Sequence, residues 1–188
     1  MAEMKQDRRT RYTCMVIKDA LLKLLEEKTY SAITVADICR ESEISRGTLY
    51  LHYKNISEIL DELFTDALQN VNGVFEQLTS AVIEPSCGYP LCVFLRNSRK
   101  YRPLFFSNEL RTEAINRIMR INEASFVAGL RQRGDHADDT ALRALLYFQL
   151  NGCLAVCRQT IDLPDAEWER IRSVIDLSLQ TGYAQIKP

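Results

Sequence analysis

Three closely spaced helix starts between residues 34 and 58 constrain the fold of this chain more than any other feature of its sequence. Each start pairs a Ser, Thr or Asn with a polar residue three positions on, and the pairs are Thr34 with Asp37, Ser45 with Thr48, and Asn55 with Glu58. The first side chain accepts an amide proton that a helix start leaves unbonded, and the second can bond back. The first two helices are therefore short and joined by a tight turn at residues 42–44. This is helix-turn-helix geometry, whose second helix is placed to enter a DNA major groove.

The stretch from residue 8 to residue 64 resembles the DNA-binding domain of TetR-type transcriptional regulators, the TetR/AcrR family. The matching positions are Ile33, Thr34, Val35, Asp37, Ile38, Ser45, Gly47, Thr48, Leu49, Tyr50, His52, Tyr53, Lys54 and Leu60. Two positions depart from the family pattern. Glu43 stands where a Gly is common in the turn, and a non-Gly residue with positive φ there costs about 1 kcal/mol. Ile56 stands where a Lys is common, which puts one expected phosphate contact in doubt.

Helical periodicity continues through the rest of the chain, without a convincing run of alternating apolar and polar residues typical of a strand. We expect helices over residues 7–28, 35–41, 46–53, 55–81, 91–100, 102–106, 109–133, 138–160 and 164–183, with the clearest break at residues 84–90. On the first helix we expect one buried stripe of Tyr12, Val16, Ile17, Leu21, Leu24 and Leu25. The sequence thus predicts an all-α protein of about nine helices. Residues 1–54 form a three-helix helix-turn-helix DNA-binding domain, and residues 55–188 form a helical regulatory and dimerisation domain.

The last two expected helices carry wide apolar faces. These faces hold Leu142, Leu145, Leu146, Phe148, Gln149, Gly152 and Val156 on one helix, and Ile171, Val174, Ile175, Leu177 and Leu179 on the other. A monomer that exposed both would show more contiguous apolar surface than the few hundred Å² usually tolerated. We therefore expect a homodimer through these two helices, as the family resemblance also implies, with burial inside one chain as the alternative. Two-fold symmetry then suits a palindromic operator.

Residues at the start of the second short helix are the candidates for contact with DNA bases. They are Ser45, Arg46, Gly47, Thr48 and Tyr50. Arg46 is the main candidate for sequence discrimination, because a guanidinium can bond guanine O6 and N7 together. An ion pair with Glu43 is the alternative role for Arg46, and it is too weak to compete with a base.

Phosphate contacts are expected from a second set of residues, namely Arg8, Arg9, Arg11, Thr34, Tyr50, His52, Tyr53 and Lys54. Two of these have alternative roles, with Tyr53 as a core aromatic and His52 as an ordinary surface residue. The net charge of −1 hides a modest asymmetry that suits this expectation. Residues 1–54 carry ten Lys and Arg against eight Asp and Glu, or +2, and the remainder carries −3.

The six cysteines are expected to be reduced and inert, although Cys153 and Cys157 share a helix face at a spacing that could hold a metal or form a sensor pair. We expect no metal and no cofactor. The apolar stretch at residues 141–157 is interrupted by Arg143, Gln149 and Asn151, and no signal peptide is visible. A cytoplasmic protein without a membrane partner is therefore expected.

Aromatic residues in the second half of the chain raise the question of a ligand. The resemblance implies that a small-molecule effector binds within the helical bundle, and the candidates for lining its pocket are Phe94, Tyr101, Phe105, Phe126 and Tyr147. A packed core is the alternative. Two functions stay open: a repressor that a small molecule releases from its operator, or a regulator, activators included, whose bundle docks a partner protein. An enzyme is not expected, since the sequence holds no legible catalytic constellation.

Overall fold

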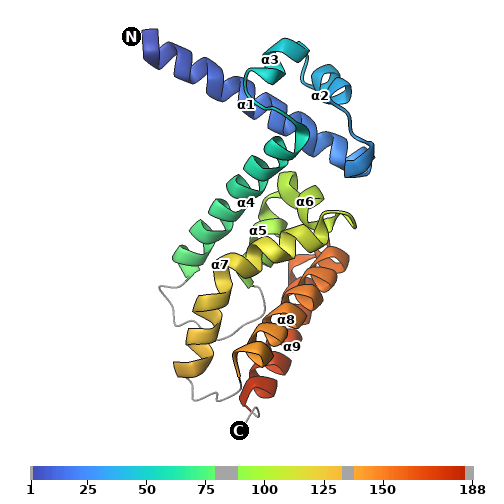
Figure 1. The fold of residues 1–188 in the computed structure, drawn as a ribbon. Helices are drawn as coiled ribbons and strands as arrows, with labels where there is room; N and C mark the ends of the chain where they lie inside the picture. The colour runs from blue at the N-terminus through green and yellow to red at the C-terminus, as the bar shows by residue number, and fades with distance from the viewer. Residues whose placement is uncertain (1, 79–88, 133–137, 185–188) are drawn as a thin grey trace. The chain divides into compact units, whose positions relative to one another are not determined.

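The computed structural model describes residues 2–78, 89–132 and 138–184 of the chain. The helices in these ranges are α1 (Ala2–Glu27), α2 (Val35–Glu41), α3 (Arg46–Tyr50), α4 (Ile56–Leu78), α5 (Tyr89–Asn97), α6 (Arg102–Phe106), α7 (Arg111–Gln132), α8 (Asp139–Thr160) and α9 (Asp165–Ala184), with short 3-10 turns at Tyr30–Ala32 and Arg99–Tyr101 (Figure 1). The prediction of an all-α protein is confirmed. Most of the predicted break at residues 84–90, including Cys87, lies outside the described residues.

Three predicted helix boundaries were wrong by three residues or more. The first helix begins at Ala2 instead of residue 7, α3 ends at Tyr50 instead of residue 53, and α5 ends at Asn97 instead of residue 100. At the end of α3 the amides of His52 and Tyr53 both donate to the carbonyl of Leu49, at 3.0 and 2.9 Å. Two donors on one carbonyl close the helix in a tighter turn.

The chain forms two compact units. The N-terminal unit comprises residues 1–69 and 100–110, and the C-terminal unit comprises residues 70–99 and 111–188. Helix α4 therefore begins in the first unit and ends in the second. The functional boundary expected at residue 54 stays a prediction, and each unit is described below by itself.

The core of the N-terminal unit forms where α2, α3, α4 and α6 cover the second half of α1. Its fully buried side chains are Ile17, Leu21, Ile38, Leu49, Ile59, Leu63, Phe64, Leu104 and Phe105. Burying each contributes roughly 1.5–3 kcal/mol. The rings of Phe64 and Phe105 meet edge to face with centroids 6.1 Å apart. This core fixes α2 and α3 against α1 (Figure 1).

The prediction that Tyr12 lies in the buried stripe of α1 was wrong. Tyr12 is 64% exposed, whereas complete burial on this helix begins at Ile17. The reason is that the first half of α1 extends beyond the helices that cover the second half (Figure 1). The periodicity of a helix marks which face is apolar, and the neighbouring elements decide how far along the helix that face is covered.

The C-terminal unit packs α8 against α5 and α7. The buried side chains of α8 follow helical spacing and are Leu142, Leu146, Gln149, Leu150, Cys153, Leu154 and Cys157. Arg96 of α5 donates to the carbonyl oxygens of Ile161 and Leu163, at 2.8 and 2.7 Å, and so satisfies the C-terminal end of α8. By length and composition alone α8 could cross a membrane, a test that the core helix of a folded domain also passes. Four leucines of α8 are buried inside the unit, and 39% of its most apolar window is buried.

Candidate nucleic-acid interface

The N-terminus of α2 is fixed by a complete capping box. The Thr34 hydroxyl oxygen accepts from the Asp37 amide at 3.2 Å, and the Asp37 carboxylate accepts from the Thr34 amide at 3.1 Å and from its hydroxyl at 2.8 Å. Lys28 lies 3.0 Å from the same carboxylate, which also pairs with Arg40. Hydrogen bonds from Thr34 and Lys28 hold the pKa of Asp37 well below its usual range. The predicted cap is confirmed.

The turn between α2 and α3 contains the strained residue that the sequence predicted. Glu43 has φ 55°, in the left-handed region. Its amide donates to the Arg40 carbonyl at 3.4 Å, and the Ile44 amide donates to the Cys39 carbonyl at 3.1 Å. This pair of bonds is a Schellman ending, which glycine adopts most easily. The expected positive φ at Glu43 is confirmed, and the two bonds hold the carboxylate-bearing residue there.

Helix α3 is capped at one end and anchored at its centre. The Ser45 hydroxyl oxygen accepts from the Thr48 amide at 3.0 Å, as predicted, and the two hydroxyls lie 2.9 Å apart. Leu49 is completely buried and fixes the inner face of the helix. The outer face is therefore directed to solvent, and Arg46, Gly47 and Tyr50 are exposed on it.

Gly47 leaves open space above the backbone of α3. A methyl group built at this position would meet the Ser45 hydroxyl oxygen at 3.8 Å, an ordinary contact distance. The packing of the chain itself therefore does not require a glycine here. Arg46 forms no ion pair within the described residues, so the alternative pairing with Glu43 is not made. The guanidinium beside Gly47 is left available to a bound molecule.

Tyr53 belongs to a polar network between α1 and α4. The side chain is 4% exposed, and its hydroxyl donates to the Glu62 carboxylate at 2.6 Å. Lys18 donates to Glu62 at 2.9 Å and to Asp66 at 2.5 Å. Burial, and then the hydrogen bond to Glu62, raise the pKa of Tyr53. This geometry favours the core role that the sequence left open for Tyr53.

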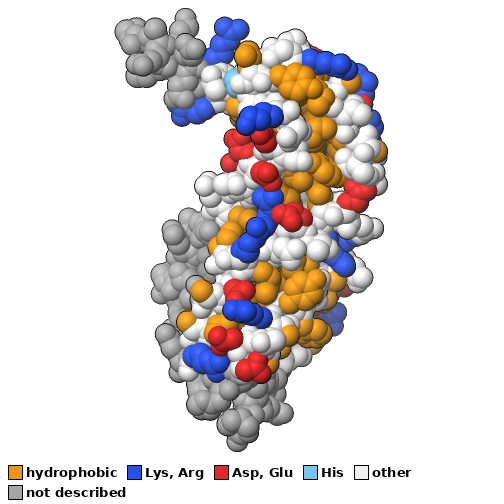
Figure 2. Space-filling view, viewed as in Figure 1, with side chains coloured by type: hydrophobic (Ala, Val, Ile, Leu, Met, Phe, Trp, Pro, Cys, Tyr) orange, Lys and Arg blue, Asp and Glu red, His pale blue; other side chains and the backbone are white. Residues whose placement is uncertain are grey.

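The remaining candidate residues lie around α3. Lys54 is exposed at the start of α4, where the Glu58 amide donates to the Asn55 side chain at 3.0 Å and confirms the third predicted cap. His52 is half-buried, whereas Arg8, Arg9 and Arg11 are exposed on the uncovered half of α1. Figure 2 shows Lys and Arg side chains beside exposed hydrophobic ones on the N-terminal unit. Sequence reasoning missed one exposed residue on this surface, Leu51, which the spacing of Arg46, Gly47 and Tyr50 on one helical face would have indicated.

The five aromatic residues predicted to line a ligand pocket are dispersed. Tyr101 and Phe105 belong to the N-terminal unit, and Phe94, Phe126 and Tyr147 belong to the C-terminal unit. Phe94 and Phe105 are buried, Tyr101 and Phe126 are half-buried, and Tyr147 is exposed. The structure therefore does not gather these side chains around one cavity within either unit.

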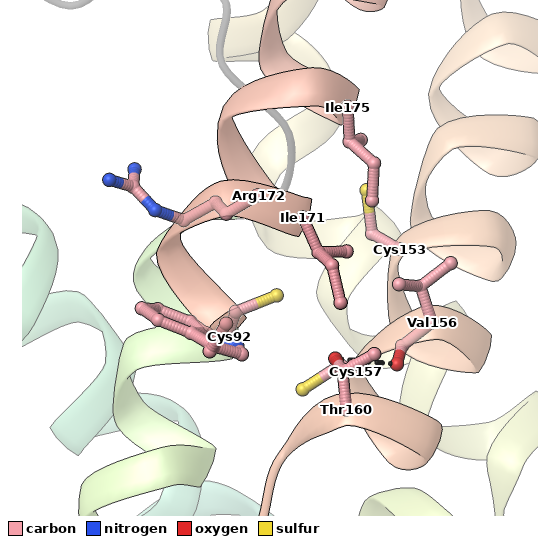
Figure 3. A pocket seen from close by; sticks show the side chains of 9 residues that line it. Cys92, Cys153, Val156, Cys157, Thr160, Ile171, Arg172 and Ile175 are labelled. Atoms are coloured by element: carbon pink, nitrogen blue, oxygen red, sulfur yellow. Dashed lines mark hydrogen bonds between the residues drawn. The ribbon is translucent and has the colours of Figure 1, made fainter. Parts of the chain in front are cut away.

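A different set of residues lines a small pocket in the C-terminal unit (Figure 3). The lining comprises Cys92, Cys153, Val156, Cys157, Thr160, Trp168, Ile171, Arg172 and Ile175. The cavity volume is about 20 Å³, which is room for one water molecule. Its three cysteines are buried, and the Arg172 guanidinium points away from their sulfur atoms in Figure 3. No group of three metal-binding side chains is found in the ranges that the structure describes.

Comparison with known proteins gives matches to the N-terminal part of the chain. Residues 17–63 match the family model "Bacterial regulatory proteins, tetR family". An uncharacterized HTH-type transcriptional regulator, YxbF of Bacillus subtilis, is 42% identical over 62 residues. These residues are 32% of this chain and 16% of YxbF, so the match covers only a small part of that relative. No solved structure matches the chain. The matched segment contains the capped helices α2 and α3 and most of their core.

Proposed function

We propose that this chain, which belongs to the TetR family of bacterial regulatory proteins, binds duplex DNA through the outer face of α3 and thereby represses transcription. The observation that carries the proposal is the exposed face of α3, where Arg46 projects beside the open backbone of Gly47 on a helix anchored by buried Leu49. A side chain held in this way can bond a guanine edge in the major groove.

The residues around α3 divide into two roles under this proposal. Arg46, Ser45, Thr48 and Tyr50 meet base edges, and Gly47 lets the backbone approach the duplex. Phosphate contacts come from Arg8, Arg9, Arg11, Thr34, His52 and Lys54, which set register and release counterions. Tyr53 acts as a positioning residue, because its hydroxyl is engaged with Glu62.

We further propose a homodimer through α8 and α9. Large hydrophobic side chains are exposed on these helices, including Phe148 at 69% and Leu177 at 65%. Figure 2 shows hydrophobic side chains along the surface where Figure 1 draws the two helices. Gly152 is exposed on α8 with open space above it, which allows a second helix to approach closely. A symmetric pair of α3 helices suits a palindromic operator.

We also propose that the protein is a cytoplasmic repressor, and that a small apolar effector releases it from its operator. An effector can release DNA only if it binds the form with low DNA affinity more tightly. The alternative is a partner protein that docks on the bundle, with activation as one possible result. One observation favours that alternative: the pocket found in the described part of the C-terminal unit holds about 20 Å³, whereas pockets for drug-sized ligands have volumes of roughly 300–1,000 Å³. A thermal-shift screen of the full chain against small molecules tests for an effector, because a small molecule that binds the folded chain raises its unfolding temperature.

The DNA-binding proposal is tested by two substitutions in the same unit. We expect Arg46→Ala to lose about 1–3 kcal/mol of discrimination between a selected duplex and a scrambled one. Lys54→Ala should weaken binding to both duplexes alike and reduce the salt dependence, because a phosphate contact carries no sequence. Fluorescence anisotropy at several salt concentrations measures both effects. The reverse pattern would overturn the assignment.

A further inference from the structure

Leu51 is the most exposed large hydrophobic side chain in the described part of the chain, at 81%. It follows α3 directly and keeps helical backbone angles, with φ −68° and ψ −22°. Its amide donates to the Gly47 carbonyl at 3.2 Å, so the helical path continues through this residue. Leu51 therefore stands on the same face as Gly47, four residues earlier, and next to Tyr50.

Leu51 gains little from packing in the described part of the N-terminal unit, because most of its surface is exposed. Leu49, two residues earlier, is completely buried and supplies the anchor of α3. A single exposed leucine is ordinary on a protein surface. This one, however, shares its helical face with Gly47, where the backbone of α3 is proposed to approach the duplex. An apolar side chain in that position would be buried when this backbone approaches the base edges.

We propose that Leu51 reads a thymine methyl group in each half of the operator. The inference rests on the proposed function, because it adds a further base contact to those proposed for α3. In the major groove, thymine alone presents a C5 methyl group, and an apolar side chain recognises it by contact.

Replacing thymine by uracil tests this contact alone, because deoxyuridine differs from thymidine only in lacking the C5 methyl group. The full-length protein is first used to select duplexes from a random pool. Each thymine of the selected duplex is then replaced by deoxyuridine, one position at a time, and the Kd is measured. For the unmodified protein we expect a loss of about fourfold at one thymine per half-site, the value of one buried methyl group.

Leu51→Ala should bind the thymine and uracil duplexes equally at that position. Its unfolding temperature should change little, since the side chain is exposed. Ile121→Ala is the matched control, because Ile121 is an exposed aliphatic residue of α7, and this variant should keep the fourfold ratio. Tyr50→Ala should also keep a preference for thymine at the position assigned to Leu51.

Three results overturn the inference. In the first, the unmodified protein binds every uracil duplex as tightly as the thymine duplex. In the other two, the ratio of the Kd for uracil to the Kd for thymine persists in Leu51→Ala, or is removed only by Tyr50→Ala. Arg46→Ala separates these results from a failure of the proposed function. If Arg46→Ala loses discrimination while uracil has no effect, the thymine contact alone is refuted. If no duplex is preferred, or Arg46→Ala discriminates as before, both proposals fail.

Discussion

The region around α2 and α3 and the surface of α8 and α9 differ in how their side chains are satisfied. Around α2 and α3, polar side chains are engaged in short-range pairs: Thr34 with Asp37, Ser45 with Thr48, and Tyr53 with Glu62. Along α8 and α9, large apolar side chains such as Phe148 and Leu177 lie exposed. The helix starts of the first region are bonded within its own chain, whereas the second region has the composition of a surface that another molecule covers.

The two regions are stabilised by different interactions, local hydrogen bonds in the first and burial of apolar surface in the second. Hydrogen bonds between residues three positions apart fix where α2 and α3 begin, and they act whether or not a second chain is present. The outer faces of α8 and α9 gain their free energy only when apolar area leaves water, which needs a partner. Perturbations confined to one unit should therefore affect either folding and DNA reading, or assembly.

The largest effect is expected from a charge on the exposed apolar face of α8. Phe148→Glu should lower the association constant of the proposed dimer by about a hundredfold or more, because two carboxylates would then enter an apolar interface. Analytical ultracentrifugation measures the change. Tyr12→Glu is the matched control, since Tyr12 is similarly exposed but lies in the N-terminal unit. A monomeric native protein, or equal effects of both variants, would contradict the proposed interface.

An effect of comparable size should follow from removing the anchor of α3. Leu49→Ala should destabilise the protein by about 2–5 kcal/mol, because it leaves a cavity in the core. Leu51→Ala should stay within about 0.5 kcal/mol, since Leu51 is exposed. Urea unfolding of the full chain compares the two leucines directly. Similar losses of stability for both variants would mean that the side chain of Leu51 is not directed to solvent.

Relief of the turn strain should give a gain in stability. Glu43→Gly is expected to raise the free energy of unfolding by up to about 1 kcal/mol, because glycine adopts the φ of 55° at this position without steric cost. Glu43→Ala provides the control, since alanine keeps the unfavourable conformation and should give no such gain. If both variants stabilise equally, removal of the carboxylate charge, and not the backbone, is the cause.

The smallest effect concerns pH and the capping box. The pKa of Asp37 is lowered in the folded protein, so its stabilising contribution is complete above its ordinary pKa of about 3.9 and is lost as the pH falls below that value. The free energy of unfolding should therefore decrease in acid, and Asp37→Asn should flatten this decrease. Thr34→Ala removes the main cause of the shift, so its decrease in acid should be smaller and should level off at a higher pH. Parallel curves for all three proteins would show that Asp37 does not titrate in this way.

Sequence reasoning succeeded where structure depends on neighbours along the chain. The caps at Thr34, Ser45 and Asn55 are such features, and all three formed where they were predicted. The family pattern, which commonly has glycine at position 43, likewise pointed to the positive φ that Glu43 adopts.

The failures concern features that depend on packing between distant segments. Tyr12 fits the apolar periodicity of α1, but no periodicity states where the covering helices end. The pocket lining brings Cys92 of α5 together with Trp168 of α9, which are remote in sequence. The sequence left open whether Tyr53 contacts a phosphate or lies in the core. Its hydroxyl bonds Glu62, which also accepts from Lys18, and only the folded chain brings these three residues together.

The uncovered first half of α1 has a calorimetric consequence. Residues 8–12 are all exposed, so this stretch gains little from tertiary packing, and a helix of such length is marginally stable in water. It should fray on warming before the remainder of the fold melts. If Arg8 and Arg9 engage phosphates, association with DNA rewinds the frayed turns and releases their heat of helix formation. The measured enthalpy of association should then grow more exothermic as temperature rises, beyond the change that buried apolar area alone produces.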